Sequence, residues 1–373
     1  MIKRKALIST TTTVITLLYG LLNSKGSRAF DVYWNIPSFM CKQYGLDFSH
    51  LGYTYGVAQN PKDSFRGNVF TILYDPGKFP AIFEKKDTNV LYKRNGGVPQ
   101  EGNLTEHLEI FRMHVEQQMP DPNFPGVAVI DFESWRPIYR QNFGSLQPYK
   151  DLSMKIEKDR HPLYNKKMLE AEATRRFEAT GQDFMAQTLT LAKQLRPQAS
   201  WGYYAFPYCF NMNGHPANQR EDCVAEVQRE NDRIQWLFDD SDIIFPSVYL
   251  REKLSPGDRV KLVRGRVKEA VRVARNVRGF PYGQKPPVLT YMRYVYTDTI
   301  GYLTESDWIN TLNAMKQLGS DGVILWGSSY DLNTREKCFE FKNYMDNTLG
   351  PILVSLQRRY FVEGLKLSDD VGC

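Results

Sequence analysis

Short apolar segments alternate with longer helix-forming segments about seven times along the chain, and this alternation constrains the fold most strongly. The apolar segments are rich in β-branched and aromatic residues and are bounded by Pro, Gly, Ser or Asp, as strands are; they comprise residues 30–37, 69–77, 126–133, 200–207, 242–250, 286–294 and 321–329. Helices are predicted at 104–119, 166–195, 224–238, 257–277, 304–319 and 334–350. Gly181 is a candidate break in the second helix, and Thr304 and Gly319 are candidate start and stop signals of the fifth.

Repeated strand–helix units of this kind predict an α/β domain with a parallel sheet. The sequence contains no glycine-rich dinucleotide-binding motif, so a closed, TIM-like (β/α) barrel of about seven parallel strands is favoured over an open, doubly wound sheet. We assign residues 30–350 to this barrel and residues 351–373 to a C-terminal extension.

The first 29 residues are typical of a secretory signal peptide. Residues 3–5 are basic, residues 6–22 are modestly apolar, and residues 27–29 offer small side chains at the cleavage positions. The expected product is a secreted, extracellular chain without a membrane span. Cleavage would remove five basic residues and no acid, which lowers the net charge from +6 to +1. Binding to a polyanion would therefore depend on local patches, and nucleic acid is not an expected partner.

Five cysteines follow residue 29, and in an oxidising compartment four of them are expected to form two disulfides. Free buried thiols are the alternative. The spacings match no zinc motif. Asn103 begins the sequence Asn-Leu-Thr, a glycosylation sequon that predicts an exposed loop if it is used.

Acidic and aromatic residues stand at the carboxyl ends of the predicted strands, where barrel enzymes place their active sites. These residues are Tyr74, Asp75, Asp131, Glu133, Tyr203, Tyr204, Tyr249 and Trp326, the last followed by Gly327, Ser328 and Ser329. Flat rings stack on sugars, and carboxylates can act on a glycosidic oxygen. The strand ends together favour a polysaccharide cleft, although each tyrosine or tryptophan alone could equally be part of the core.

Asp131 and Glu133 are two positions apart, so on a strand they would point to the same side. Two like charges this close should raise the pKa of one of them, which produces a general acid. We assign that role to Glu133 because its side chain is longer. The alternative is a solvated strand end, or a pair tied to Arg136 or Arg140. No second carboxylate is evident at a spacing typical of a two-carboxylate glycosidase, which leaves a substrate-assisted reaction with Asp131 orienting an acetamido group.

Six segments, taken in combination, closely resemble the hyaluronidases of glycoside hydrolase family 56, particularly the venom-type enzymes. They are ILYDPG (72–77), NGGVPQ (95–100), VIDFESWRPI (129–138), WGYYAFPYC (201–209), PSVYL (246–250) and ILWGSS (324–329). The similarity extends from about Phe30 to Gly350. Larger members of the family carry a cysteine-rich module after the barrel, and the resemblance is to the members without one. Cys373, the last residue of the sequence, has no partner in the family pattern and could be free, could link to another chain or could mark a truncated end.

The resemblance implies a distorted (β/α) barrel that hydrolyses the β-1,4 bond after N-acetylglucosamine in hyaluronan, with retention and acetamido participation. Glu133 would be the proton donor and Asp131 its partner. The groove would contain Tyr74, Tyr204, Tyr249 and Trp326, with Ser328 and Arg136 as further contacts. The implied disulfides join Cys41 to Cys338 and Cys209 to Cys223. No metal or organic cofactor is implied, and we expect a monomer.

Other readings of the same residues remain open. A catalytically inactive glycan-binding protein could use this scaffold, although the presence of both Asp131 and Glu133 argues against it. A glycosidase acting on chitin or chondroitin is a further alternative. The basic tract 259–278 is read mainly as a solvated helix face, with Arg266 as its best candidate for attracting glucuronate.

Overall fold

A computed structural model describes residues 30–85, 90–280 and 284–356. The predicted signal peptide and Cys373 lie outside these residues. Within the described part of the chain, no helix is long and apolar enough to cross a membrane. The helix that contains Met345–Leu349 continues as far as residue 356, six residues into the segment that we assigned to a C-terminal extension.

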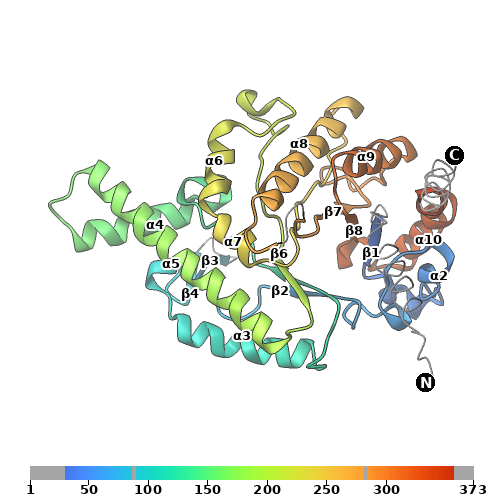
Figure 1. Cartoon of the computed structure of the whole chain (residues 1–373), viewed down its shortest axis with the longest axis horizontal. Helices are drawn as coiled ribbons and strands as arrows, with labels where there is room; N and C mark the ends of the chain where they lie inside the picture. Colours follow the sequence, from blue (N-terminus) through green and yellow to red (C-terminus); the bar gives the residue numbers. More distant parts are fainter. Residues whose placement is uncertain (1–29, 86–89, 281–283, 357–373) are drawn as a thin grey trace, which may run out of the picture. The chain divides into compact units, whose positions relative to one another are not determined.

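The strands form a distorted (β/α) barrel (Figure 1). In one parallel sheet β1 (Asp31–Asn35) and β7 (Leu289–Arg293) flank β8 (Gly322–Trp326), and in the other β2 (Phe70–Tyr74) and β6 (Ser200–Tyr203) flank β5 (Val127–Asp131). Between β6 and β7, the predicted strand at 242–250 makes only isolated bridges. Pro246 lies inside this segment and lacks the N–H that a regular ladder needs, so the prediction of a regular strand there was wrong.

The strand registers bring the carboxyl ends together at one edge of the barrel. Tyr74 is paired with Asp131, and Trp326 is paired with both Asn35 and Arg293. The barrel interior is filled by apolar and aromatic side chains, as expected for parallel strands covered by helices; they include Phe70, Ile72, Val127, Val129, Phe245, Leu289, Tyr291 and Ile324. The polar strand ends are therefore positioned on top of a packed core.

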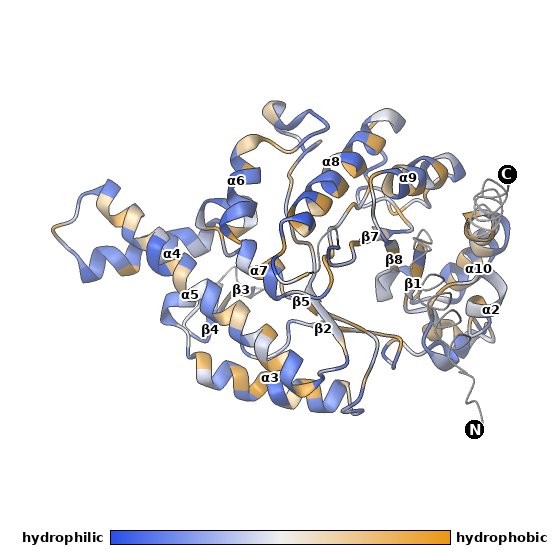
Figure 2. Ribbon diagram, in the orientation of Figure 1, coloured by the Kyte–Doolittle hydropathy of each residue, from blue (hydrophilic) through white to orange (hydrophobic). Residues whose placement is uncertain are grey.

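Helices surround the strands (Figure 1), and most carry both hydrophilic and hydrophobic residues (Figure 2). They are α2 (Leu51–Tyr55), α3 (Leu104–Gln118), α4 (Gln147–Arg160), α5 (Lys166–Leu195), α6 (Ala225–Arg233), α7 (Gln235–Asp240), α8 (Pro256–Arg275), α9 (Glu305–Gln317) and α10 (Arg335–Tyr344). Several begin at a side chain that accepts a hydrogen bond from the first turn; these caps include Asn103, Asn165, Ser255, Thr304 and Thr334. The start predicted at Thr304 is confirmed, and Gly319 follows α9 with a φ of 86°.

Several helix and strand predictions were wrong in detail. Helix α5 is not broken at Gly181; a glycine fits there because an added Cβ would lie 3.3 Å from the Trp135 ring. The helix predicted at 224–238 is two helices, α6 and α7, that meet at Ile234. The pattern also missed α4 and an antiparallel hairpin of β3 (Ala81–Lys85) and β4 (Val90–Arg94). These elements contain several charged residues and lie outside the barrel sheets, so the spacing of their hydrophobic residues does not predict them.

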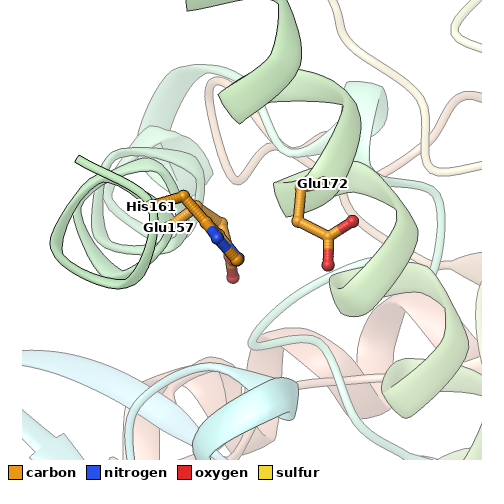
Figure 3. Close-up of side chains that lie close together, drawn as sticks. All are labelled: Glu157, His161 and Glu172. Atoms are coloured by element: carbon orange, nitrogen blue, oxygen red, sulfur yellow. The ribbon is translucent and has the colours of Figure 1, made fainter. Parts of the chain in front are cut away.

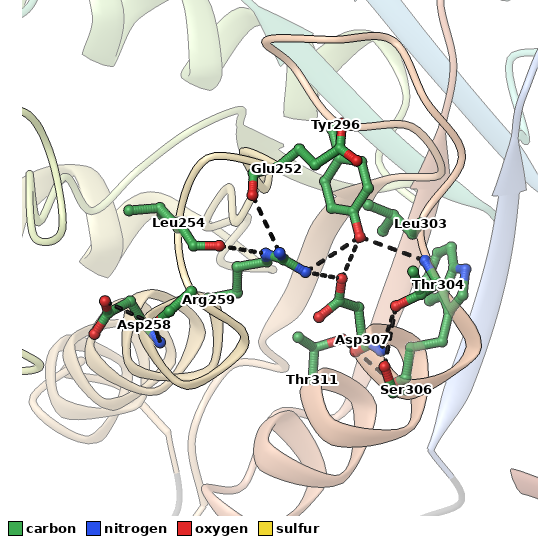
Figure 4. Close-up of polar contacts among 12 residues, drawn as sticks. Glu252, Leu254, Asp258, Arg259, Tyr296, Leu303, Thr304, Ser306, Asp307 and Thr311 are labelled. Atoms are coloured by element: carbon green, nitrogen blue, oxygen red, sulfur yellow. Dashed lines mark hydrogen bonds and ion pairs between the residues drawn. The ribbon is translucent and has the colours of Figure 1, made fainter.

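Two disulfides join cysteines of the described residues, and they are the ones implied by the family resemblance. Cys41–Cys338 joins the segment after β1 to α10 across 297 residues, and Cys209–Cys223 closes a short loop after β6. A buried polar cluster also joins α8 to α9 (Figure 4). There the Arg259 guanidinium binds the Asp307 carboxylate and donates to the backbone oxygens of Glu252 and Leu254, while the Tyr296 hydroxyl donates to Asp307.

Candidate active site

Asp131 and Glu133 form a hydrogen-bonded pair of carboxyl groups at the edge of the barrel. Asp131 is the last residue of β5, whereas Glu133 lies two residues further on, beyond the end of the strand. The prediction that both lie on the strand was therefore wrong, although their side chains do meet. Phe132, between them, points into the core and stacks on Phe79 at 4.0 Å. Because this packing holds Phe132 in the core, it also restricts the position of the next residue, Glu133.

The pair holds protons more tightly than isolated carboxyl groups. Burial is the main cause of the raised pKa of Asp131; the charge of Glu133, the hydrogen bond to it and the charge of Asp75 raise the pKa further. Burial also raises the pKa of Glu133, while the hydrogen bond from Asp131 and the charge of Arg136 partly oppose that rise. In the free protein, Asp131 thus donates to Glu133, and the raised pKa belongs to the pair rather than to Glu133 alone.

Three aromatic side chains lie together near this pair, at the same edge of the barrel, and we call them the aromatic wall. The Trp326 ring stacks on the Tyr249 ring at 5.7 Å, and Trp326 Nε1 donates a hydrogen bond of 2.9 Å to the Tyr74 hydroxyl. Tyr74 is 41% exposed, so its ring is accessible at the edge of the barrel. The flat, partly exposed surface is suited to stacking on sugar rings.

Tyr204 is more deeply buried than Tyr74 and lies near both Tyr249 and Glu133. Its hydroxyl donates a hydrogen bond of 3.1 Å to Ser247 Oγ, and its ring lies 6.4 Å from that of Tyr249. Burial, first, and then the charge of Glu133 raise the pKa of Tyr204, which keeps the hydroxyl neutral. Tyr203 points the other way and donates to the Met185 carbonyl, so only Tyr204 contributes to the site.

A pocket of about 230 Å³ opens next to Glu133. Its walls include Tyr204, Ser247, Tyr208, Phe210 and two arginines, Arg136 and Arg266. The size and the mixture of aromatic and charged walls would suit one sugar ring with an anionic substituent.

Both arginines of this pocket are held by neutral groups. Arg136 donates to the Gln141 carbonyl at 2.5 Å and packs on the rings of Tyr208 and Phe210, while its Nε is buried without a hydrogen-bond partner. Arg266 donates to Asn211 Oδ1 at 3.2 Å and to the Ser247 carbonyl at 2.8 Å. Burial lowers the pKa of Arg266 to about 10. These guanidinium groups leave positive charge available to an incoming anion.

The neighbouring charged residues are engaged elsewhere. Arg140, the alternative partner of the carboxyl pair, binds Glu230 instead. On α8, Arg264 pairs with Glu221, and Arg272 pairs with Glu269 and Asp232, so much of the basic tract is an ion-paired helix face.

Ser328 and Trp326 are held in place by a buried ion pair behind the aromatic wall. Arg293 donates to both carboxylate oxygens of Asp331 at 2.7 and 2.9 Å, and its guanidinium lies 5.6 Å from the centre of the Trp326 ring. Asp331 in turn accepts a hydrogen bond of 2.9 Å from the Ser328 backbone N–H. The described hydrogen bonds of Ser328 go to its own turn, so its contact with a substrate stays a prediction.

The sequence pattern did not single out Ser247, Tyr208, Phe210, Arg293 or Asp331. Arg293 is the last residue of β7, so its place at a strand end is a signal that could have identified it, whereas Ser247 lies within the segment 242–250. The place of Tyr208 and Phe210 depends on the loop after β6, which the disulfide Cys209–Cys223 closes, and no periodicity indicates that loop.

A (β/α) barrel with a carboxyl pair and aromatic side chains at the carboxyl ends of its strands, and with two arginines in the pocket beside the pair, has the site of a glycoside hydrolase. A profile of the family described as Hyaluronidase, glycoside hydrolase family 56, matches residues 23–361. The chain belongs to that family.

The similarity to individual members covers most of the chain. A hyaluronidase of Apis mellifera is 51% identical over 330 residues, which is 88% of this chain and 85% of the bee protein. A hyaluronidase of Tabanus yao, Tab y 2.0101, is 49% identical over 89% of this chain and 94% of the relative. The crystal structure of bee venom hyaluronidase in complex with a hyaluronic acid tetramer matches with a TM-score of 0.84 and 50% identity, over 88% of this chain and 99% of that one.

Proposed function

We propose that this chain is a secreted endo-β-N-acetylhexosaminidase that hydrolyses the β-1,4 bond of hyaluronan with retention, and that the substrate's acetamido group is the nucleophile. The observation that carries the proposal is the hydrogen bond between Asp131 and Glu133. Two carboxyl groups in direct contact are closer than the about 5 Å of a retaining pair or the wider gap of an inverting pair. Asp75, the other carboxylate that acts on Asp131, is bound by Arg94.

In the proposed first step, the acetamido oxygen attacks the anomeric carbon while Glu133 donates its proton to the glycosidic oxygen. The C–O bond to the leaving sugar breaks and a cyclic oxazolinium forms, whose N–H is stabilised by the Asp131 carboxylate. In the second step, Glu133 accepts a proton from water, the water oxygen bonds to the anomeric carbon, and the ring opens to the acetamide. The product retains its configuration because the anomeric carbon is inverted twice.

The raised pKa of the pair supplies the proton for the first step, although Asp131 holds that proton in the free protein. With one proton shared between the two groups, binding of a sugar at Asp131 would leave that proton on Glu133. Tyr204 and Tyr249 line the same region, and their neutral hydroxyls would position the acetamido group.

The two pocket arginines favour a polyanion over neutral chitin. Arg136 and Arg266 lie in the pocket that contains Glu133, and their described hydrogen bonds leave them without a carboxylate partner. A glucuronate carboxylate would supply the missing charge. Chondroitin carries the same acid, so we propose it as a second substrate.

The first experiment compares Glu133→Gln with the exposed control Glu109→Gln, using purified hyaluronan and measuring product size and new reducing ends. We expect Glu133→Gln to lower kcat by at least about a hundredfold with little change in hyaluronan binding, and Glu109→Gln to match the unchanged protein. Near-normal turnover by Glu133→Gln would contradict its role as the acid.

The products also separate this proposal from its alternatives. NMR of the first products should show the β-anomer, whereas an α-anomer would indicate inversion and a 4,5-double bond would indicate a lyase. Hyaluronan that is bound but never shortened would indicate a glycan-binding protein. Binding to hyaluronan should weaken as salt is raised, which a neutral chitin ligand would not show.

Secretion and a monomeric state complete the proposal. The sequence of residues 1–29 supports secretion, as do the two disulfides, which form in oxidising compartments. Recovery of the chain from culture medium with a new N-terminus near residue 30 would test the first point. Light scattering would test the second.

A further inference from the structure

Three side chains that could bind a metal ion face one another where α4 and α5 pack together (Figure 3). Glu157 and His161 lie one helical turn apart at the end of α4, and Glu172 lies on the first part of α5. One ligand atom from each side chain lies within 4.8 Å of the other two. We propose that Glu157, His161 and Glu172 bind a zinc ion that joins α4 to α5, a site separate from the groove.

Glu157 provides the strongest reason to expect a cation. Its side chain is fully buried, and Oε2 has no hydrogen-bond partner. The other oxygen, Oε1, is bound by Arg176, so Oε2 is the atom that remains free within the cluster. A buried carboxylate oxygen without a partner is costly, and a metal ion would supply the missing contact.

The distance between the two α4 ligands fits one metal ion better than a direct bond. His161 Nε2 lies 3.8 Å from Glu157 Oε2, which is too long for a hydrogen bond. A zinc ion about 2.1 Å from both atoms would subtend an angle of about 130°, somewhat wider than tetrahedral. The His161 ring also stacks on the Tyr164 ring at 4.5 Å, which limits its rotation.

To bind the zinc ion, Glu172 would have to give up one of its two hydrogen bonds with Arg175. Both of its oxygens accept hydrogen bonds from Arg175, at 2.9 and 2.6 Å, but the Arg175 side chain is 66% exposed and the pair is three residues apart on one helix. Such surface pairs contribute little to stability, so a zinc ion can displace one of these contacts. Water would occupy the fourth position, since His161 and Glu172 are partly exposed.

The test is isothermal titration calorimetry of the chelator-treated full chain with zinc chloride. We expect one zinc ion per chain, an affinity at least tenfold weaker in His161→Gln and in Glu172→Gln, and no change in His50→Gln, a histidine outside the cluster. Zinc should also raise the Tm of the unchanged chain but not that of His161→Gln. Circular dichroism and turnover of hyaluronan by His161→Gln would establish that this variant is folded.

Equal zinc affinity in His161→Gln and the unchanged chain would overturn the proposal, as would a loss of binding in His50→Gln or the absence of a zinc-dependent Tm shift. Glu157→Gln is less suitable as the main variant because it also weakens the buried contact with Arg176. Cobalt as a substitute ion gives an independent readout: intense visible absorption indicates tetrahedral coordination, whereas weak octahedral bands would exclude the proposed geometry.

Discussion

Trp326 Nε1 donates a hydrogen bond of 2.9 Å to the Tyr74 hydroxyl, although 252 residues separate the two side chains. Trp326 ends β8 and Tyr74 ends β2, the strands on either side of β1. Within the described residues no ladder joins β1 to β2, so the two sheets meet there without backbone pairing. The side-chain bond therefore connects the two sheets at the edge where the groove lies.

We predict that Tyr74→Phe lowers kcat/KM about two- to tenfold, because one neutral hydrogen bond contributes about 1 kcal/mol. Trp326→Phe should cost more, since it also reduces the stacking surface next to Tyr249 from an indole to a smaller phenyl ring. Expressed as free energies, the two losses should not add in the double variant. The difference between their sum and the loss in the double variant measures the energy of the hydrogen bond. Tyr53→Phe, at a residue that is 85% exposed, is the control. Fully additive losses would mean that the bond does not organise the groove.

A second prediction concerns the ion pair behind the aromatic wall. Arg293→Lys cannot keep both contacts, to the Asp331 carboxylate and to the Trp326 ring, because an ammonium group lacks the flat guanidinium surface that lies over the ring. We expect KM for hyaluronan to rise about threefold or more, while the pH profile set by the carboxyl pair stays unchanged. The same change at Arg275, an exposed residue of α8, should have no effect. A shifted pH profile would instead place Arg293 in direct contact with the chemistry.

The third prediction concerns the buried cluster between α8 and α9. Asp307→Asn would leave the Arg259 guanidinium, which is 10% exposed, without its countercharge. Removing one partner of such a pair costs about 3–5 kcal/mol, and urea unfolding should show a loss near the lower value because Arg259 keeps two backbone carbonyl acceptors. Replacing both residues, as Arg259→Met with Asp307→Leu, should cost less than Asp307→Asn alone. A larger loss in the double variant would contradict this account.

The sequence predicted the barrel and much of the site for a simple geometric reason. Parallel strands all end at the same edge, so acids and aromatics at successive strand ends must come close together, as Asp131, Tyr204 and Trp326 do. Whether each of these residues acts in catalysis stays a prediction.

Long-range contacts could not be predicted in this way. Arg266 reaches the pocket from α8 only because that helix packs beside the segment containing Ser247. Arg293, at the end of β7, meets Asp331 in the turn after β8, 38 residues further along the chain. The hydrophobic pattern describes which face of an element is buried but not which neighbour it meets. Strand geometry predicted that the side chains of Asp131 and Glu133 lie together, and they do. The strand ends at Asp131, however, so the position of Glu133 is set by the loop that follows.

The carboxyl pair should also reduce the stability of the fold near neutral pH. The pKa of Asp131 is raised in the folded protein, mainly by burial, so the folded state binds a proton that the unfolded state releases. The stabilising contribution of that proton is fully present below the unfolded pKa of about 4 and is lost as pH rises through the folded pKa. Asp131→Asn removes this dependence, because its amide carries no charge and can still donate to Glu133.

We therefore predict that Asp131→Asn raises Tm by about 1–3 °C at pH 7, although it abolishes most activity, and that this gain disappears near pH 4. Calorimetric unfolding scans at several pH values would measure the difference, with the exposed Asp159→Asn as control. A gain that is the same at every pH would show that proton binding is not its cause. A lower Tm at pH 7 would mean that the Asp131 carboxylate stabilises the fold, contrary to the effect of its burial.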